Sequence, residues 1–298
     1  MAPTSSAPRP RVLAFGEVLW DVFGSEEHIG GAPFNFAAHA VRCGLAADLL
    51  SCVGADARGG RARAEIRRLE VDDGFVATDP TRPTGRVDVQ LRDGQPTYTI
   101  APNAAWDAIP PPADDRLRRQ PYAALVCGTL AQRSAASRAT LRTVRDALAG
   151  VPVFYDVNLR PPHTPLELVQ ETLPGVTWLK LNADEAEALW REGGGGTCDA
   201  AELFERLAGQ VGLRALILTR GADGASVYTR DGAWHAAAAA IRLVSAVGAG
   251  DSFAAAFLAG WLRGHEPERC LQRATQVAGW VASCAAAIPE YPESLRDG

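Results

Sequence analysis

The sequence lacks paired cysteine motifs. Its six cysteines include no C-x-x-C spacing, and none lies beside a pair of histidines. Disulfide frameworks and structural zinc sites both need such groupings, so neither is expected. The pattern is typical of reduced, mostly buried thiols in a cytosolic protein. The six residues are Cys43, Cys52, Cys127, Cys198, Cys270 and Cys284.

Long apolar runs and a strong excess of charge are also missing. No run reaches the length of a transmembrane helix, and residues 1–10, rich in Pro, Ser and Ala, lack the apolar centre of a secretion signal. We expect residues 1–10 to be a disordered tail, residues 11–298 to be the folded unit, and the protein to be cytoplasmic. The net charge of −5 gives no reason to expect a nucleic-acid or membrane partner, although a local site can still hold an anion.

Two familiar phosphate-binding motifs do not occur. The P-loop pattern G-x-x-x-x-G-K-[ST] is absent, and the first predicted strand ends in G-E-V-L-W-D instead of G-x-G-x-x-G. A dinucleotide-binding oxidoreductase therefore lacks the feature that it needs. The four glycines at 193–196 follow no strand and precede no lysine, so we interpret them as a flexible loop.

What is present is an alternation of apolar strands with helices. The 298 residues are 47% hydrophobic and 22% charged, which allows a core of useful size. The alternation predicts an α/β fold with a mostly parallel sheet that is covered on both faces. The predicted strands are 12–15, 49–53, 124–127, 153–157, 178–181 and 216–219, and the predicted helices are 37–43, 61–69, 134–149, 200–211, 251–263 and 269–287.

One segment breaks this alternation. Residues 86–91 alternate polar and apolar side chains, Arg92-Asp93-Gly94-Gln95 supplies a turn, and residues 96–100 return. We expect an exposed hairpin with one apolar face. That face must cover an active site, a second subunit, or both.

Polar residues gather just after several predicted strands. Ligands of such sheets bind at the carboxyl ends of the strands, so we expect these residues to converge there. They are Glu17 with Asp21, Asp156 with Asn158 and Arg160, Asn182 with Glu185, and Thr219 with Gly221.

The segment Gly248-Ala249-Gly250-Asp251 opens a predicted helix. Free N–H groups of the first helical turn form an anion site, which the helix dipole reinforces. Asp251 as a simple N-cap is the plain alternative, but capping does not explain the tight Gly-Ala-Gly before it. An aspartate beside an anion hole can take a proton from a hydroxyl while the amides hold a phosphoryl group.

A second glycine-containing segment lies at residues 30–35, with the sequence G-G-A-P-F-N. Gly30 and Gly31 let the backbone approach a small ligand closely, and Asn35 can hydrogen-bond sugar hydroxyls. An ordinary loop remains the alternative for this segment taken alone.

Together these motifs resemble the ribokinase-like (PfkB) family of carbohydrate kinases, especially its fructokinase-like members. The resemblance covers about residues 11–292, and order and spacing agree throughout. The matching segments are 16–21, 30–37, 54–59, 156–160, 180–185, 219–224 and 248–251. The resemblance implies a three-layer sandwich with a small β lid, formed mainly by residues 84–103, which closes over the sugar and excludes water. It also implies a homodimer that forms through the lid.

The resemblance implies roles for single residues as well. Asp251 corresponds to the base, and Gly248, Ala249 and Gly250 complete the anion hole. Asn182 and Glu185 correspond to a pair that positions hydrated Mg²⁺. Arg160 and Lys180 meet substrate or phosphate, with a surface ion pair as the alternative for each. The implied sugar contacts are Asp21, Gly30, Gly31, Asn35, Asn103 and Arg160, and the implied ATP contacts are Lys180, Asn182, Thr219, Gly221 and Gly224.

One departure from the family pattern stands out. Members commonly read D-T-T before G-A-G-D, where this chain has Ser245, Ala246 and Val247. The missing carboxylate and hydroxyls commonly help to hold a monovalent cation, so we predict weak or absent potassium activation. The adenine pocket finds no clear match within residues 273–287.

The leading hypothesis is therefore a kinase that converts a sugar and Mg·ATP into a sugar phosphate and ADP. Fructose is the first substrate candidate, and 2-keto-3-deoxygluconate, ribose and nucleosides remain open. A non-catalytic sugar-binding regulator on the same fold is the alternative from another class. The altered residues 245–247 motivate it, whereas the intact Asp251, Asn182 and Glu185 argue against it.

Overall fold

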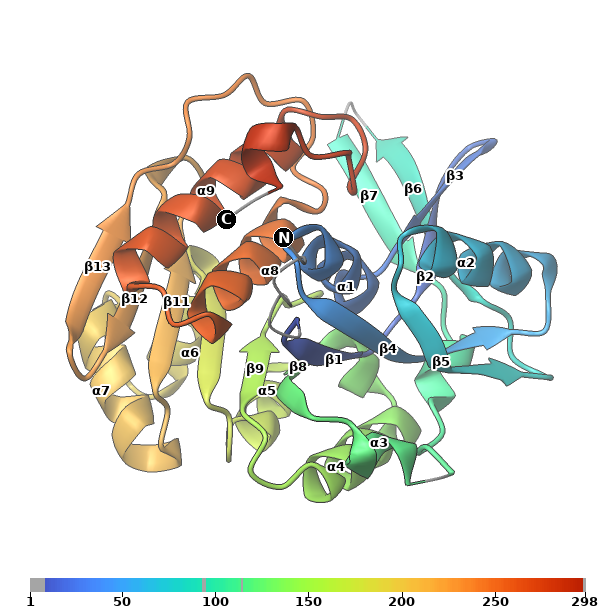
Figure 1. Ribbon diagram of the computed structural model, residues 1–298, viewed down its shortest axis with the longest axis horizontal. Coiled ribbons are helices and arrows are strands. Elements are labelled where there is room, and N and C mark those ends of the chain that lie inside the picture. The colour runs from blue at the N-terminus through green and yellow to red at the C-terminus, as the bar shows by residue number, and fades with distance from the viewer. Residues whose placement is uncertain (1–8, 93–94, 114, 297–298) are drawn as a thin grey trace, which may run out of the picture.

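A nine-stranded sheet forms the centre of the described part of the chain. The computed structural model describes residues 9–92, 95–113 and 115–296 (Figure 1). The strand order is β13-β12-β11-β10-β9-β8-β1-β4-β5. These strands are β1 Arg11–Phe15, β4 Ala46–Gly54, β5 Asp72–Asp79, β8 Tyr122–Cys127, β9 Val153–Asp156, β10 Trp178–Asn182, β11 Ala215–Thr219, β12 Ala225–Thr229 and β13 Gly232–Ala236.

The sheet is parallel from β5 to β11, and only β12 and β13 run antiparallel at one edge. The strand β1 shows why its sequence is a continuous apolar run. Val12 and Ala14 pack into one core while Leu13 and Phe15 pack into another, on the opposite face. The predicted α/β fold with a mostly parallel sheet is confirmed.

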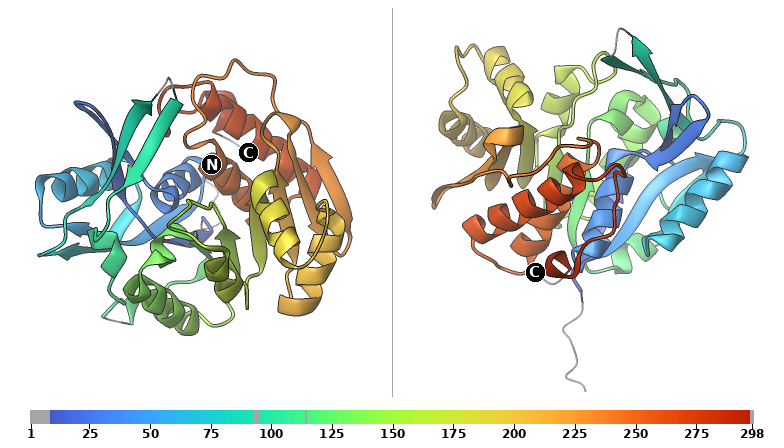
Figure 2. Two further views of the ribbon diagram at one scale, coloured as in Figure 1. Left: turned by 180° about the vertical axis from the view of Figure 1, so that it is seen from behind. Right: turned by 90° about the horizontal axis from the view of Figure 1, so that it is seen from above.

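Helices cover both faces of this sheet (Figures 1 and 2). Helices α1, α2, α8 and α9 contribute buried side chains to one core, and α4, α5, α6 and α7 contribute them to the other. The three-layer sandwich that the resemblance implied is confirmed. The helices are α1 Ala32–Arg42, α2 Ala57–Arg68, α3 Arg116–Arg119, α4 Ala135–Ala147, α5 Leu166–Thr172, α6 Ala183–Glu192, α7 Ala200–Val211, α8 Ala249–Leu262 and α9 Pro267–Ala282, with short 3₁₀ turns η1 Ala105–Ala108, η2 Leu130–Arg133, η3 Gly221–Asp223 and η4 Glu293–Leu295.

A second, four-stranded sheet lies at one side of the molecule, away from the β13 edge (Figure 1). Its order is β3-β2-β6-β7, with β2 Leu19–Phe23, β3 Glu26–Gly30, β6 Gly85–Arg92 and β7 Gln95–Ile100. The predicted hairpin is confirmed as β6 and β7, although its Asp93-Gly94 turn lies outside the described residues. Residues 19–30 supply two of its four strands, and the lid formed mainly by residues 84–103 stays a prediction.

The predicted helix 269–287 was wrong at its C-terminal end. Helix α9 ends at Ala282, whose carbonyl accepts hydrogen bonds from the amides of Val244 and Ser245. A loop from elsewhere in the chain therefore replaces the next helical turn as the partner of this carbonyl. The alanine-rich composition of residues 283–287 could not reveal that competitor.

The cysteines are free, and Cys43, Cys52, Cys127 and Cys270 are buried, as expected. Cys198 and Cys284 are only partly buried. Within the described residues, none of the helices combines the length and the apolar character that crossing a bilayer requires.

Candidate active site

The carboxyl ends of four parallel strands gather the polar clusters at one edge of the main sheet. Strands β1, β9, β10 and β11 all point the same way. Asp156, Asn182 and Thr219 are the last residues of β9, β10 and β11, and Glu17 follows β1 by two residues. Asn182 and Thr219 are direct neighbours in the register of β10 and β11. The expected convergence therefore follows from the sheet order.

The turn before α8 requires a glycine at residue 248. Gly248 has a φ of 81°, in the left-handed region, and a Cβ there would lie 2.4 Å from the carbonyl oxygen of Ala287. The amides of Gly250 and Asp251 have no backbone acceptor among the described residues, whereas the amide of Ala249 donates a long 3.3 Å bond to Ala246. Two free N–H groups thus open the helix.

Asp251 lies on this first turn and is held by a residue from the other end of the sequence. The Nδ2 of Asn35, on α1, donates to Oδ2 of Asp251 at 2.8 Å. Burial raises the pKa of Asp251 to about 6, despite the hydrogen bond from Asn35 and the nearby cations Lys180 and Arg160. The Oδ1 of Asn35 is buried and has no partner among the described residues, so it is available to a ligand hydroxyl.

Two further acids, Glu17 and Asp21, share the nearby cation Arg160 with Asp251. Glu17, which follows β1, is only 4% exposed, and its Oε2 has no partner within the described chain. Burial raises the pKa of Glu17 to about 7 and that of Asp21, on β2, to about 6. Glu17 is thereby kept partly protonated near neutral pH and can act as donor or acceptor, whereas Asp21 is mainly ionised and accepts hydrogen bonds.

The glycines at residues 30 and 31 allow the backbone to pack tightly around these acids. Gly31 has a φ of 112°, and a Cβ on it would lie 2.3 Å from the carbonyl oxygen of Glu17. A Cβ on Gly30 would lie 2.8 Å from Oδ2 of Asp21. Any side chain here would displace the acidic groups.

Arg160 is the cation that these acids share. It is exposed, and it lowers the pKa of Glu17, Asp21 and Asp251 alike. Its Nη1 donates to the carbonyl of Leu159 at 2.9 Å, and no ion pair of Arg160 is found in the described part of the chain. The alternative of a surface ion pair therefore finds no support for this residue.

Lys180, the single lysine of the sequence, lies under the α8 turn. Its Nζ donates to both oxygens of Asp156 at 2.9 Å, and it is 3.7 Å from the position that a Cβ on Gly250 would take. Burial alone would lower the pKa of Lys180, but the Asp156 carboxylate raises it. Lys180 therefore forms a buried ion pair with Asp156, and not the surface ion pair that was the alternative for this residue.

Asn182 and Glu185 form a capping box at the start of α6. The Asn182 amide donates to Oε2 of Glu185 at 2.8 Å, and the Glu185 amide donates to Oδ1 of Asn182 at 2.9 Å. The amide of Leu159 binds Oε1 of Glu185 at 2.8 Å, and burial raises the pKa of this carboxyl group. Both carboxylate oxygens of Glu185 thus accept a hydrogen bond from the backbone. Their remaining lone pairs can still accept hydrogen bonds from the water ligands of a hydrated metal ion. No group of three metal-binding acids, histidines or cysteines occurs in the ranges that the structure describes.

The remaining predicted residues lie around this core. Thr219 ends β11, with its Oγ1 3.4 Å from the Leu181 carbonyl, and Gly221 begins an exposed turn. Gly224 has a packing role, because a Cβ there would lie 2.1 Å from the carbonyl oxygen of Ala236. Asn103 is exposed after β7 and accepts a hydrogen bond from Arg82 at 3.2 Å. None of the hydrogen bonds among the described residues links Asn103 to Asp251 or Asn35.

Sequence reasoning gave no role to two features of this site. Glu17 was noted only for its place after a strand, and nothing local signals that it is buried. The loop before Gly248 carries four exposed apolar side chains, a pattern that the run I-R-L-V next to G-A-G-D could have suggested. They are Ile241, Leu243, Val244 and Val247, which are 42%, 66%, 56% and 43% exposed.

Known proteins with similar sequences and folds are sugar kinases. The 2-dehydro-3-deoxygluconokinase of Thermoproteus tenax is 28% identical over 268 residues, which cover 86% of this chain and 80% of that protein. The fructokinase of Klebsiella pneumoniae is 28% identical over 243 residues, covering 78% of this chain and 76% of that protein. A crystal structure of a fructokinase with bound ATP from Xylella fastidiosa superposes with a TM-score of 0.84 at 21% identity, over 93% of this chain and 94% of that one.

A match to a family model over nearly the whole length of the chain shows which family it belongs to. The description "pfkB family carbohydrate kinase" fits residues 7–294, which include both sheets and every residue of the site. The chain belongs to the pfkB family of carbohydrate kinases and is a sugar kinase.

Proposed function

We propose that this kinase transfers the γ-phosphoryl group of Mg·ATP to a hydroxyl of fructose, with Asp251 as the general base. The observation that carries the proposal is the Asp251 carboxylate, which Asn35 holds at 2.8 Å beside two free helix amides. A base and an anion site in contact are what phosphoryl transfer to an alcohol needs.

The chemistry follows from these positions. Asp251 accepts the hydroxyl proton as that oxygen forms its bond to the γ-phosphorus, and the bond from this phosphorus to the ADP oxygen breaks. The amides of Gly250 and Asp251 bind the transferring group, and the Lys180 ammonium supplies positive charge beneath them. Because the pKa of Asp251 is about 6, the carboxylate form prevails at neutral pH.

The nucleotide and its ion are assigned to the neighbouring strand ends. Thr219 ends β11 beside Asn182, and Gly221 follows it in an exposed turn. The four exposed apolar side chains at residues 241–247 offer a surface for the adenine ring. Asn182 and Glu185 would hold Mg²⁺ through its water ligands, which suits an ion that gives up its hydration shell reluctantly. When bound, Mg²⁺ neutralises charge on the phosphates.

The sugar is assigned to the space among Asp21, Asn35 and Glu17, with Gly30 and Gly31 as its backbone wall. The partly protonated Glu17, the Asp21 carboxylate and the unpaired amide oxygen of Asn35 suit a neutral polyol, since each can pair with a hydroxyl. The relationship to the Klebsiella pneumoniae fructokinase supports fructose as the substrate.

Arg160 favours a second candidate, a sugar acid such as 2-keto-3-deoxygluconate. An exposed guanidinium without an ion pair among the described residues can bind a substrate carboxylate, and the Thermoproteus tenax relative is named for this type of substrate. An assay of ADP release over both compounds, with ribose and adenosine included, decides between them. If the acid is the substrate, Arg160→Gln should raise its KM about tenfold or more, whereas turnover of fructose with an unchanged KM in that variant supports the first candidate.

The base assignment is tested by Asp251→Asn. We expect kcat to fall about 10²–10⁴-fold while sugar affinity is largely retained, because the amide keeps the shape but cannot accept the proton. Asn182→Ala serves as a comparison that should raise the Mg²⁺ requirement without removing the base. Unchanged turnover in Asp251→Asn would exclude this residue from the mechanism.

The residues before the turn bear on monovalent cations. Ser245, Ala246 and Val247 provide no carboxylate, and the Ser245 hydroxyl accepts the amide of Val247 at 3.3 Å. We therefore expect activity in potassium chloride to equal activity in tetramethylammonium chloride at matched ionic strength. Several-fold stimulation by potassium would contradict this expectation.

A further inference from the structure

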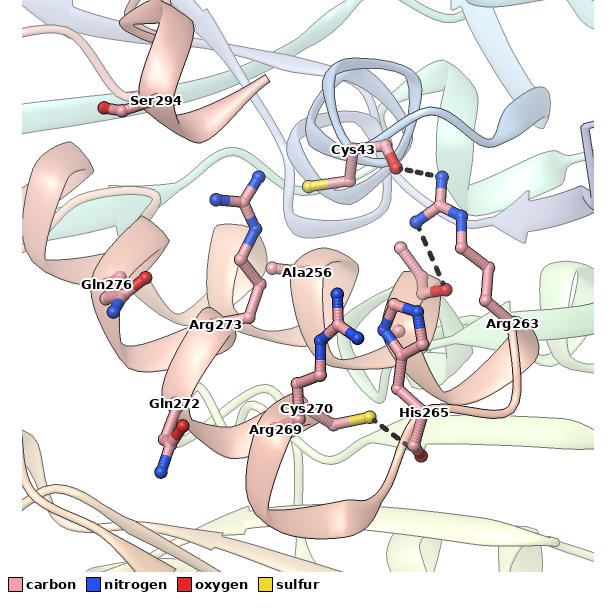
Figure 3. Close-up of a pocket in the computed structure, with 12 residues that line it drawn as sticks. Cys43, Ala256, Arg263, His265, Arg269, Cys270, Gln272, Arg273, Gln276 and Ser294 are labelled. Atoms are coloured by element: carbon pink, nitrogen blue, oxygen red, sulfur yellow. Dashed lines mark hydrogen bonds between the residues drawn. The ribbon is translucent and has the colours of Figure 1, made fainter. Parts of the chain in front are cut away.

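A cavity lies between the C-terminal half of α8, the N-terminal half of α9 and the end of α1 (Figure 3). Its volume is about 260 Å³. Its lining on α8 starts at Ala256 and includes Ala259, eight residues beyond Asp251, which is roughly 12 Å along the helix. None of the residues assigned to sugar, ATP or Mg²⁺ lines it.

The lining of this cavity is cationic. Arg263, Arg269 and Arg273 reach it together with His265, while no aspartate or glutamate among the described residues lines it. This concentration of positive charge stands out in a chain with a net charge of −5. Figure 3 shows Arg269, Arg273 and His265 pointing to the same side, toward the end of α1.

Arg269 and Arg273 are the groups available to an anion. They are four residues apart on α9 and therefore lie on the same face of the helix, one turn from each other. Arg273 donates to the carbonyl of Leu295, a neutral acceptor, and Arg269 has no ion pair in the described chain. Arg263 is fixed across the cavity by its bond to the Cys43 carbonyl at 2.7 Å, so it forms part of the wall.

The environment of His265 is consistent with a positive field in this cavity. Burial lowers the pKa of His265 first, and the charges of Arg269 and Arg263 lower it further. Gln272, Gln276 and Ser294 add neutral hydrogen-bonding groups at the rim. The nearest acid on the helix, Glu268, is engaged with Gln272 at 3.2 Å.

We propose that this cavity is a binding site for a small phosphate monoester, separate from the catalytic site. Two guanidinium groups one turn apart match the several oxygens of a phosphate dianion, each of which can accept more than one N–H bond. The volume suits a phosphate with a short carbon skeleton and is small for a whole nucleotide.

The simplest competing explanation is that these arginines have only a structural role. Arg273 would hold α9 against the segment at Leu295, and Arg263 would hold the end of α8 against the end of α1. That explanation predicts a loss of stability on substitution, with no saturable anion binding. The proposal predicts saturable binding in the parent protein that depends on Arg269, whose side chain makes no hydrogen bond or ion pair with the part of the chain that the structure describes.

The test is isothermal calorimetry with glycerol 3-phosphate, using glycerol as the uncharged control. We expect saturable binding of glycerol 3-phosphate and no binding of glycerol. The affinity for glycerol 3-phosphate should fall about tenfold or more in Arg269→Gln and in Arg273→Gln. Arg230→Gln, on the turn between β12 and β13, removes an exposed arginine elsewhere and should leave the affinity unchanged. Circular dichroism on each variant verifies folding, and Arg269→Gln remains informative if Arg273→Gln unfolds.

Two results would overturn the proposal. Absence of saturable binding by the folded parent is one. The other is binding that persists at full strength in Arg269→Gln and Arg273→Gln, since the phosphate would then occupy another site such as the catalytic one.

Discussion

At the scale of single residues, the site depends on acids that the fold keeps away from water. Glu17 illustrates this, because burial raises its pKa from 4.5 to about 7. Between these pH values the folded protein binds more protons than the unfolded chain. Its stability should therefore fall as pH rises through this window, by on the order of 3 kcal/mol in total for this group.

Replacing this acid should remove that pH dependence. Glu17→Gln is expected to gain stability relative to the parent as pH rises from about 5 to 8, an effect that urea unfolding at several pH values would measure. The exposed Glu205→Gln is the control, and its difference from the parent should not vary in this way. A constant difference between Glu17→Gln and the parent would argue that Glu17 ionises normally in the folded state.

Local patterns could predict some of these residues but not their encounters. The Gly-Ala-Gly-Asp turn is visible in the sequence because glycines and a helix start are local features. The bond between Asn35 and Asp251 joins residues 216 positions apart, and only the family resemblance could bring them together. The buried state of Glu17 depends on Gly31 and on neighbouring charges, so no local pattern reports it.

At the scale of elements, α8 is positioned by the glycine before it. In Gly248→Ala, the left-handed φ costs about 1–2 kcal/mol, and the new Cβ also collides with the Ala287 carbonyl. We expect a loss of stability above 2 kcal/mol, together with a large drop in kcat because the turn carries Asp251.

Gly264→Ala is the matched control at the other end of the same helix. Gly264 has a φ of 75°, but no atom lies within 4 Å of a Cβ placed there. This variant should lose only about 1 kcal/mol and retain activity. Thermal unfolding and initial rates on both variants separate the two effects, and equal losses would show that the Ala287 contact is unimportant.

Elements whose ends are set by local residues were predicted more accurately than elements that depend on pairing with distant strands. Helix α7 was predicted as residues 200–211 and has those bounds, since Asp199 caps its start and Gly212 ends it in a left-handed conformation. Strands β2, β3, β5, β12 and β13 were not predicted. In β3, β5 and β13, exposed positions are mixed with buried ones, so these three strands do not form continuous apolar runs. Their pairing partners, not their own composition, define them.

At the scale of the whole molecule, the small sheet presents an apolar face that we propose as a dimer interface. The strand register places Leu19, Asp21 and Phe23 on the same face as Val87, Val89 and Tyr98. Leu19, Val87 and Val89 are buried, whereas Phe23 is 43% and Tyr98 is 55% exposed. A second copy of the lid would cover these two rings.

Sedimentation velocity tests this interface. We expect the parent protein to be a dimer and Tyr98→Glu to be a monomer, because a carboxylate would have to be desolvated in the contact. Thr99→Glu places the same charge on the opposite face of β7 and should remain dimeric. A monomeric parent, or a dimer that tolerates Tyr98→Glu, would contradict the assignment.

The burial of the only lysine has a practical outcome for labelling. Lys180 is 6% exposed and paired with Asp156, so amine-directed acylating reagents cannot reach it in the folded protein. An acetylating N-hydroxysuccinimide ester should therefore leave Lys180 unmodified in the folded protein and should acetylate it only after unfolding. Peptide-mass spectrometry of residue 180 would then report the integrity of the turn that opens α8 as a mass difference.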